Sequence, residues 1–407
     1  MGNIIVGQSG GPTAVINASL AGVFKGGKDN NIKVYGMING IQGLLDEKYV
    51  DLSQEIKTDL DIELLKRTPS AYLGSCRFKL PNMEDNEEIY EKIFSILKKI
   101  DIDTFFYIGG NDSMDTIKKL HTYSIAKNKK IKFIGVPKTI DNDLAVTDHT
   151  PGFGSACKYI ATTIKEIIKD ATVYDAKNIT IIEIMGRNAG WLTGAAAITK
   201  SNDCSGVDLI YLPEVVFDIE EFIDKVKKLQ KTKKSLVIAV SEGIKNKNGV
   251  NICELEEENT LLDCFGHKSL SGTANTLARI LYKKLGCKTR AIELNTTQRC
   301  ASHLVSEVDI NESFLAGVYA VNVALSGENG KVIVFERTSN TPYNINMKSH
   351  NVYDIANVEK RVPIEWIDSK NGTVSNELIE YIKPLIQGEV YPIMVDGLPK
   401  HLKLNRY

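Results

Sequence analysis

Lys138 and two acidic residues stand close together, directly after the apolar run 133–136. The residues that follow Lys138 are Thr-Ile-Asp-Asn-Asp, at positions 139–143. A carboxylate in this place could take a proton from a hydroxyl nucleophile, as a general base does. The adjacent ammonium could stabilise the charge that builds on a transferring phosphoryl group. The same residues also fit an Asx turn or a helix cap beside a surface lysine, so the segment by itself leaves both interpretations open.

Two glycine pairs follow other apolar runs, at positions 10–11 and 109–110. Glycine lets the backbone approach a phosphate closely, and a helix that begins behind the loop offers unpaired N–H donors. Either pair alone could simply make a tight turn, but their shared placement favours anion binding. Ser9 and Ser113 stand beside them, as further hydroxyl donors or as helix N-caps.

Three arginines and a glutamate stand in comparable loops. Arg77 ends the segment 73–77, Arg187 follows a glycine, and Arg299 follows a glutamine. A guanidinium offers a planar fork that suits a phosphate or a sugar hydroxyl, although most arginines are only solvated surface. Glu242, at the end of an apolar run, could accept hydrogen bonds from a sugar or cap the next helix.

Short apolar runs alternate with amphipathic stretches, and these elements must position the polar loops. The runs that we expect to be strands are 4–7, 105–109, 132–136, 179–184, 208–212, 236–240, 291–294 and 332–336. Apolar periodicity predicts helices over 87–100 and 271–285, and a last helix near 376–384. This alternation is typical of a doubly wound α/β fold, in which ligands bind beyond the carboxyl ends of the strands. Five of the runs end in polar, glycine-bearing loops, which we expect to converge on one crevice.

Composition narrows the class of protein. The 407 residues carry 50 Lys+Arg against 51 Asp+Glu, so no global basic field would attract nucleic acid. Seven scattered cysteines without a CxxC pair argue against a disulfide framework or a zinc site and fit a reducing cytosol. No apolar run approaches the ~18 residues of a membrane span, and no basic leader opens the chain. We therefore expect a cytoplasmic protein with no membrane or nucleic-acid partner.

Taken together, these loops resemble the phosphofructokinase family, and the match runs in order along the chain to about residue 340. The segments that resemble its phosphoryl-donor side are 9–11 with Asn17, 73–77 and 109–113. The segments that resemble its sugar-phosphate side are 139–143, 185–187, 241–243 and 298–299. Thr-Ile-Asp-Asn-Asp followed by Met-Gly-Arg at this separation is a specific signal, whereas either glycine pair is weak by itself.

The resemblance implies a fold and a division into domains. We expect an α/β protein of two doubly wound, Rossmann-like domains with mostly parallel sheets, with the active site in the cleft between them and a C-terminal extension. The expected phosphoryl-donor domain comprises residues 1–140 and is rejoined by 304–355. The expected sugar-phosphate domain is 141–303, and the extension is 356–407.

Two positions choose the phosphoryl donor. Family members that use ATP carry glycine where this chain has Asp112 and Lys138, and the pair found here marks the members that use pyrophosphate. A carboxylate at Asp112 would repel the α-phosphate of ATP, and Lys138 could neutralise a leaving phosphate that no nucleotide arm anchors. The resemblance thus implies a glycolytic kinase that moves a phosphoryl group reversibly from pyrophosphate to the C1 hydroxyl of fructose 6-phosphate. The alternatives are an ATP-dependent 6-phosphofructokinase and a catalytically weak regulatory paralogue that binds sugar phosphate.

The resemblance also implies a role for each site residue. Asp141 would be the base, acting with Lys138 and Asp112. The residues that would bind the donor are Gly11, Arg77, Gly110, Asp112, Ser113 and Lys138. The residues that would bind the sugar phosphate are Thr139, Ile140, Asp141, Asp143, Met185, Gly186, Arg187, Glu242, Thr296 and Arg299. In the family the last arginine comes from a neighbouring subunit, which implies a homo-oligomer, a dimer or a tetramer.

Mg²⁺ is the implied cofactor, and its site departs from the family pattern. The usual metal-binding aspartate is Asn111 here, a weaker and neutral ligand, so we expect the ion to arrive mainly on pyrophosphate. Another departure is Asn178, which replaces an arginine seven residues before Met185 and leaves one phosphate contact without a residue.

Overall fold

The computed structural model describes residues 2–255 and 272–404, which fold into two compact units. The first unit comprises Met1–Ser155, Arg299–Glu359 and Gln387–Tyr407, and the second comprises Ala156–Gln298 and Lys360–Ile386. The chain therefore crosses between the units near residues 155 and 298, where the sequence suggested 140 and 303. The roles that we expect for the two units, donor binding and sugar binding, stay predictions.

A seven-stranded sheet forms the centre of the first unit, in the order β11-β10-β5-β4-β1-β2-β3. Its strands are β1 (Asn3–Gln8), β2 (Val34–Met37), β3 (Tyr49–Asp51), β4 (Ile102–Gly109), β5 (Lys132–Pro137), β10 (Lys331–Asn340) and β11 (Tyr343–Asn351). The five strands from β10 to β2 are parallel, and the edge strands β3 and β11 pair antiparallel to their neighbours. Because β1, β4 and β5 are parallel neighbours, the loops that follow them leave the same edge of the sheet.

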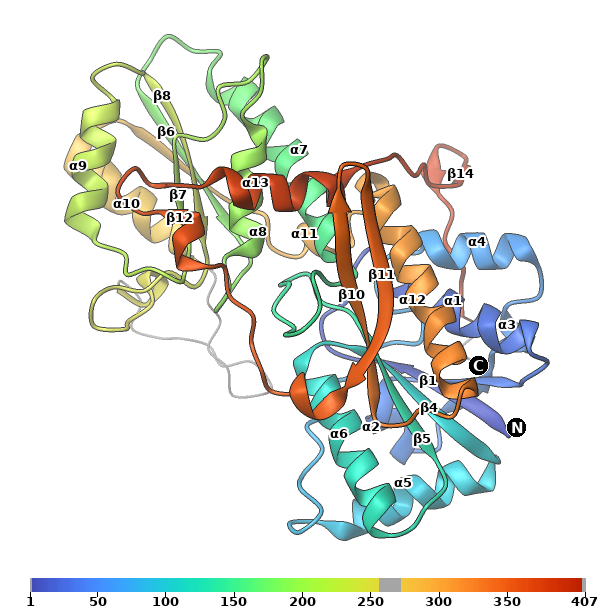
Figure 1. Ribbon diagram of the computed structural model, residues 1–407. Coiled ribbons are helices and arrows are strands. Elements are labelled where there is room, and N and C mark those ends of the chain that lie inside the picture. Colours follow the sequence, from blue (N-terminus) through green and yellow to red (C-terminus); the bar gives the residue numbers. More distant parts are fainter. Residues whose placement is uncertain (1, 256–271, 405–407) are drawn as a thin grey trace. The chain divides into compact units, whose positions relative to one another are not determined.

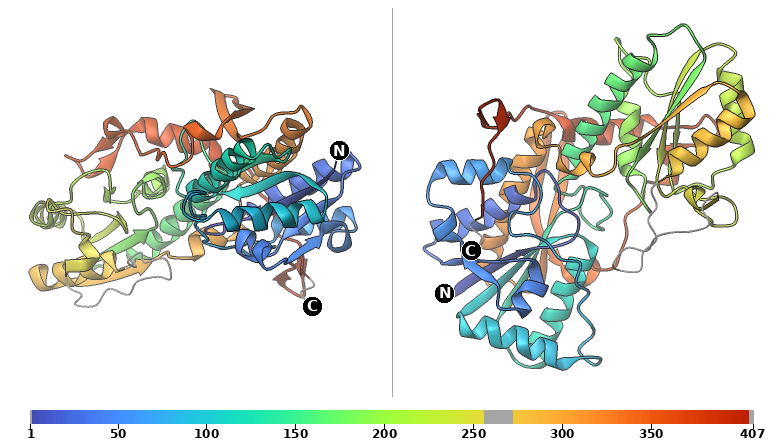
Figure 2. Two further views of the ribbon diagram at one scale, coloured as in Figure 1. Left: turned by 90° about the horizontal axis from the view of Figure 1, so that it is seen from below. Right: turned by 180° about the vertical axis from the view of Figure 1, so that it is seen from behind.

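Helices cover both faces of this sheet (Figure 1). On one face, α1 (Ile16–Asp29) and α12 (Glu307–Leu325) bury apolar side chains against β1, β4 and β5. On the other face lie α5 (Glu87–Lys99) and α6 (Asn111–Ala126), which Figure 2 shows together in cyan. The remaining helices of this unit are α2 (Gly40–Leu45), α3 (Leu52–Glu55), α4 (Asp59–Arg67) and α11 (Thr297–Cys300), the last of which begins in the second unit.

The second unit is built on a four-stranded, wholly parallel sheet in the order β7-β8-β6-β9. Its strands are β6 (Asn178–Ile184), β7 (Leu209–Tyr211), β8 (Ser235–Ser241) and β9 (Lys288–Glu293). One face is covered by α9 (Ile219–Leu229) and α10 (Thr273–Leu285), which share an apolar cluster with β6 and β8. The long helix α7 (Phe153–Ala171) and the short α8 (Trp191–Gly194) lie on the other side (Figure 1).

The predicted fold class, two doubly wound units with mostly parallel sheets, is confirmed. Each of the eight predicted strands is present, and the helices predicted over 87–100 and 376–384 correspond to α5 and α13 (Asn376–Ile382). The helix predicted over 271–285 begins at Thr273, and residue 271 lies outside the described residues. Within the described part of the chain, no helix is long and apolar enough to cross a membrane.

The residues after 355, where the sequence suggested a C-terminal extension, are divided between the two units. Residues 360–386 belong to the second unit, where Trp191 contacts Trp366 and Tyr381. Gly372 accepts a hydrogen bond from the N–H of Ile210 in β7 (2.8 Å). Residues 387–407 return to the first unit. In the second unit the segment 360–386 also buries Leu378 and Ile382, both on α13.

Candidate active site

The loop after β1 is held by the segment that contains Arg77. The N–H of Gly10 donates to Cys76 O (3.1 Å), and the hydroxyl of Ser75 donates to Gly10 O (2.6 Å). Gly10 has φ +75°, a left-handed conformation that favours glycine. The two segments that the sequence identified separately, 9–11 and 73–77, therefore form one hydrogen-bonded structure.

The second glycine pair opens helix α6. Gly110 is the N-cap and has no side chain, so the first-turn N–H groups are not capped by the cap residue. Gly109 permits a close approach, because a Cβ there would lie 1.9 Å from the hydroxyl of Ser113. Ser113 is buried inside this turn, whereas Asp112 is exposed in the first turn of the helix. An anion at this N-terminus would therefore meet the carboxylate of Asp112.

Lys138 is buried between these loops. Its side chain is 3% exposed, its Nζ donates to Gly11 O (2.5 Å), and its backbone N–H donates to Gly109 O (2.9 Å). Burial, together with the positive charges of Arg299 and Arg77, lowers the pKa of Lys138 to about 8, although Asp141 and Asp143 oppose the shift. The lysine thus lies within electrostatic reach of two acids and two arginines of its own unit.

The acidic segment 139–143 runs on from β5 without regular structure. The N–H of Asp141 donates to the hydroxyl of Thr139 (3.1 Å), so the threonine supports the turn at this position. Asn142 is fully buried and has φ +54°. Ile140 is buried (7% exposed), so its side chain contributes to packing and only its backbone could meet a substrate.

Asn111 and Asp143 meet at the start of α6. Asn111 Nδ2 donates to Asp143 Oδ2 (3.3 Å), and the buried Asn111 Oδ1 has no hydrogen-bond partner among the residues described. A buried carbonyl oxygen beside a carboxylate suits Mg²⁺, which prefers oxygen ligands and often takes only one or two from the protein. The described residues contain no group of three or more His, Cys, Asp or Glu side chains that could hold a metal. Asn111 and Asp143 are therefore the residues at this point that could contact such an ion.

Arg299 lies beside the donor loop of its own chain. A Cβ on Gly11 would come within 3.1 Å of its guanidinium, and its charge acts on Lys138. The short helix α11 directs Arg299 to these residues, and the expectation that it reaches a neighbouring subunit's site stays a prediction. Arg77, by contrast, is exposed.

The loops of the second unit form a separate cluster of substrate-binding candidates. The N–H of Gly186 donates to Glu242 Oε1 (3.3 Å), and the N–H of Met185 donates to Gln298 Oε1 (3.3 Å). Gly186 has φ +143°, and the hydroxyl of Ser241 donates to its carbonyl. Hydrogen bonds therefore connect the three segments 185–187, 241–243 and 298–299. Their places after the neighbouring parallel strands β6, β8 and β9 predict this.

Arg187 and Thr296 are exposed at the edge of this cluster. A Cβ on Gly243 would lie 2.0 Å from Arg187 O, so the glycine after Glu242 is needed for the two loops to meet. The structure supports the grouping of these residues, and their contact with a sugar stays a prediction.

Glu183 is a further buried acid, which supports the start of α10 and which the sequence patterns did not single out. It lies in β6, is 4% exposed, and accepts hydrogen bonds from the N–H groups of Gly272 (3.2 Å) and Ala274 (2.8 Å) at the start of α10. Burial raises its pKa to about 8, although those two N–H donors oppose the shift. A charged residue inside the apolar run 179–184 was the available signal.

The chain belongs to the phosphofructokinase family, whose pattern it matches over residues 3–324. It is 38% identical over 410 residues to a pyrophosphate–fructose 6-phosphate 1-phosphotransferase of Halomonas elongata, covering 100% of this chain and 96% of that one. A protein of the same name from Xanthomonas campestris is 38% identical over 408 residues, covering 99% and 96%. The crystal structure of the pyrophosphate-dependent phosphofructokinase from Nitrosospira multiformis is 35% identical, with a TM-score of 0.88 over 99% of this chain and 96% of that chain.

We expect donor capture to weaken as Lys138 loses its proton. Its pKa of about 8 means that kcat/KM for pyrophosphate should fall as pH rises through that value, since kcat/KM reports the ionisation of the free enzyme. The measurement is a pH profile of kcat/KM for the wild type and for Lys138→Arg, whose guanidinium stays charged. The ionisation of pyrophosphate is common to both proteins. If the fall of kcat/KM at alkaline pH is unchanged in the arginine variant, the ionisation that causes it belongs to another group.

Proposed function

We propose that this chain transfers a phosphoryl group from pyrophosphate to the C1 hydroxyl of fructose 6-phosphate, giving fructose 1,6-bisphosphate and phosphate, reversibly. The observation that carries the proposal is the pair Lys138 and Asp112: a buried cation bonded to the glycine loop, and an exposed carboxylate at the start of α6. The names of the most similar relatives agree with it.

On the donor side, a diphosphate would lie against the backbone of the two glycine loops. Gly11 and Gly110 leave room for it, and Lys138 and Arg77 would balance its charge. The N-terminus of α6 adds N–H donors. Asp112 limits the space to a small donor, because a nucleotide arm would bring its α-phosphate against the carboxylate.

On the acceptor side, Asp141 would accept the proton of the C1 hydroxyl while that oxygen attacks a phosphorus of pyrophosphate in line. The bond from this phosphorus to the bridging oxygen breaks, and phosphate leaves beside Lys138. Met185, Gly186, Arg187 and Glu242 would hold the sugar.

Thr139, Asp143, Thr296 and Arg299 complete the proposed acceptor set. Arg299 is proposed to bind the 6-phosphate in the active site of a neighbouring subunit, as the resemblance implies. Asn111, supported by Asp143, would contact a Mg²⁺ ion that is bound to pyrophosphate. When bound, that ion would neutralise part of the donor's charge.

We further propose a cytoplasmic, glycolytic setting and a homo-oligomer. Scattered cysteines fit a reducing compartment. The C-terminal hairpin of β14 (Met394–Val395) and β15 (Leu398–Pro399) exposes Leu398 (71%) and stands near the exposed Tyr391 (79%), which suits a contact with a second copy. Sedimentation of the purified protein measures the subunit number.

The function is tested by a matrix of donors and acceptors with the purified protein. We expect turnover with pyrophosphate and fructose 6-phosphate, and at least about tenfold less with ATP. Two like charges placed together cost several kcal/mol, and each ~1.4 kcal/mol is a factor of ten in rate. Sedoheptulose 7-phosphate is included as a second acceptor. Strong turnover with ATP and none with pyrophosphate would overturn the donor assignment, and no turnover with either would favour the regulatory paralogue.

A further inference from the structure

The acidic segment 139–143 is supported by a loop that follows it in the sequence. The N–H of Thr139 donates to Pro151 O (3.2 Å), and the hydroxyl of Thr150 donates to Thr139 O (2.7 Å). Thr139 in turn accepts the N–H of Asp141 through its hydroxyl. The position of Asp141 therefore depends on the residues around 150.

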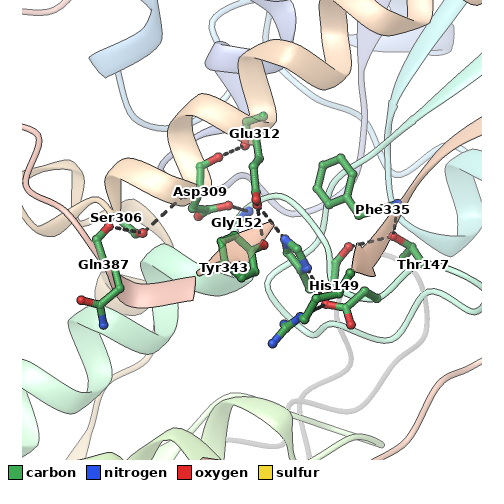
Figure 3. A network of polar contacts seen from close by, with 12 residues as sticks. Thr147, His149, Gly152, Ser306, Asp309, Glu312, Phe335, Tyr343 and Gln387 are labelled. Atoms are coloured by element: carbon green, nitrogen blue, oxygen red, sulfur yellow. Dashed lines mark hydrogen bonds and ion pairs between the residues drawn. The ribbon is translucent and has the colours of Figure 1, made fainter. Parts of the chain in front are cut away.

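This loop is anchored by a buried histidine, His149, which lies between two carboxylates (Figure 3). Its ring is 2% exposed; Nε2 lies 2.7 Å from Glu312 Oε2 in α12, and Nδ1 lies 2.8 Å from Asp148 Oδ1. Each carboxylate has a second partner from the β10–β11 hairpin. The hydroxyl of Tyr343 donates to Glu312 Oε1 (2.7 Å), and Arg337 donates to Asp148 Oδ1 (2.8 Å).

Both ring nitrogens of His149 face carboxylate oxygens. This arrangement favours the positively charged form of the ring. A neutral imidazole has one N–H and one lone pair, so one carboxylate would face a lone pair; the imidazolium donates to both. Burial opposes the positive charge, but Glu312 and Asp148 outweigh it, and the pKa of His149 is raised. With Arg337 opposite Asp148, two cations then balance two anions.

Asp309 is the next acid beside His149, and it holds the segment that follows the histidine. Asp309 of α12 accepts the N–H groups of Gly152 and Ser155 (both 2.9 Å), and burial raises its pKa. The charged and titratable groups packed around His149 are thus Asp148, Asp309, Glu312, Arg337 and Tyr343. The ring of Phe335 packs on His149 at 5.0 Å between centroids.

We infer that His149, as an imidazolium, is a positioning residue that fixes Thr139 and through it aligns Asp141 with the acceptor hydroxyl. This inference rests on the proposed function. Loss of the proton places a lone pair against a carboxylate and loosens the loop, so kcat falls as pH rises through the pKa of His149. The donor loops of β1 and β4 make their own contacts, so donor binding changes little.

The test compares His149→Gln and Tyr343→Phe with the control His121→Gln, a histidine of α6 outside this cluster. Glutamine can donate to one carboxylate only. We expect kcat to fall about 10- to 100-fold from misalignment of the base, with KM for pyrophosphate within about twofold, the pattern of an interaction used in the transition state. In His149→Gln, the fall of kcat at alkaline pH should disappear. Tyr343→Phe should move that fall to higher pH, because Glu312 loses a donor and attracts the imidazolium more strongly.

Nitrogen NMR of ¹⁵N-histidine protein gives a readout that does not depend on activity. The chain has six histidines, and the resonances lost in His149→Gln identify this ring. Protonated shifts for both nitrogens at pH 7 are expected. A neutral tautomer at pH 7, or a kcat profile unchanged in His149→Gln, would overturn the inference. Absence of pyrophosphate turnover in the wild type would instead overturn the proposed function, while the NMR result would stand.

Discussion

Replacing Asp141 by asparagine is expected to lower kcat for pyrophosphate-dependent phosphorylation by about 10²- to 10⁴-fold, the range that a positioned general base contributes. The amide cannot accept the proton of the C1 hydroxyl, yet it keeps the size of the carboxylate. The backbone N–H of Asp141 still donates to Thr139, so the turn should survive. The measurement is steady-state kinetics with both substrates varied, together with a thermal melt.

Asp143→Asn is the matched control, since it makes the same chemical change two residues away. Asp143 accepts from Asn111, so its loss should raise the Mg²⁺ concentration needed for half-maximal rate more than it lowers kcat at saturating Mg²⁺. Asp141→Asn should therefore mainly lower kcat, whereas Asp143→Asn should mainly raise the Mg²⁺ concentration that is needed. A fall of less than about tenfold in Asp141→Asn would contradict the role of base and would return weight to a regulatory, sugar-phosphate-binding paralogue.

The fold was readable from the sequence wherever strands are buried on both faces. Apolar runs such as those of β4 and β8 alternate with amphipathic stretches, and this pattern is typical of parallel strands that helices cover on both faces. The strands that the sequence did not predict are short, as in β2, or polar, as in β11, where half-buried and exposed residues alternate. The stability of β11 comes from pairing with β10, a contact that residue types do not reveal.

The candidate site was predictable residue by residue, but its supports were not. Lys138 could be identified from its neighbours, whereas its burial depends on three loops that meet in space. The role of His149 could not be predicted from local sequence, because its partner Glu312 lies 163 positions away. The direction of Arg299 likewise depends on the short helix α11, which local sequence does not orient.

The donor should change when Asp112 and Lys138 are both replaced by glycine. Lys138 is the buried cation of the glycine loop, so its loss should lower the rate with pyrophosphate by about 10²- to 10³-fold, as the loss of one charge-stabilising donor does. Asp112 is exposed at the start of α6, and its removal takes a negative charge from the helix end that favours anions. The double variant should therefore gain turnover with ATP while losing that with pyrophosphate.

The two single variants separate the attraction of phosphate by Lys138 from the repulsion of the ATP α-phosphate by Asp112. Lys138→Gly alone should lose the pyrophosphate reaction without gaining ATP, because Asp112 still repels the α-phosphate. Asp112→Gly alone should admit ATP weakly and keep most pyrophosphate turnover, because the lysine still neutralises a leaving phosphate. Specificity is the ratio of kcat/KM for the two donors, measured at one Mg²⁺ concentration and with fructose 6-phosphate saturating. If pyrophosphate turnover survived the double change undiminished, neither residue would select the donor, and selection would have to come from the rest of the glycine loops.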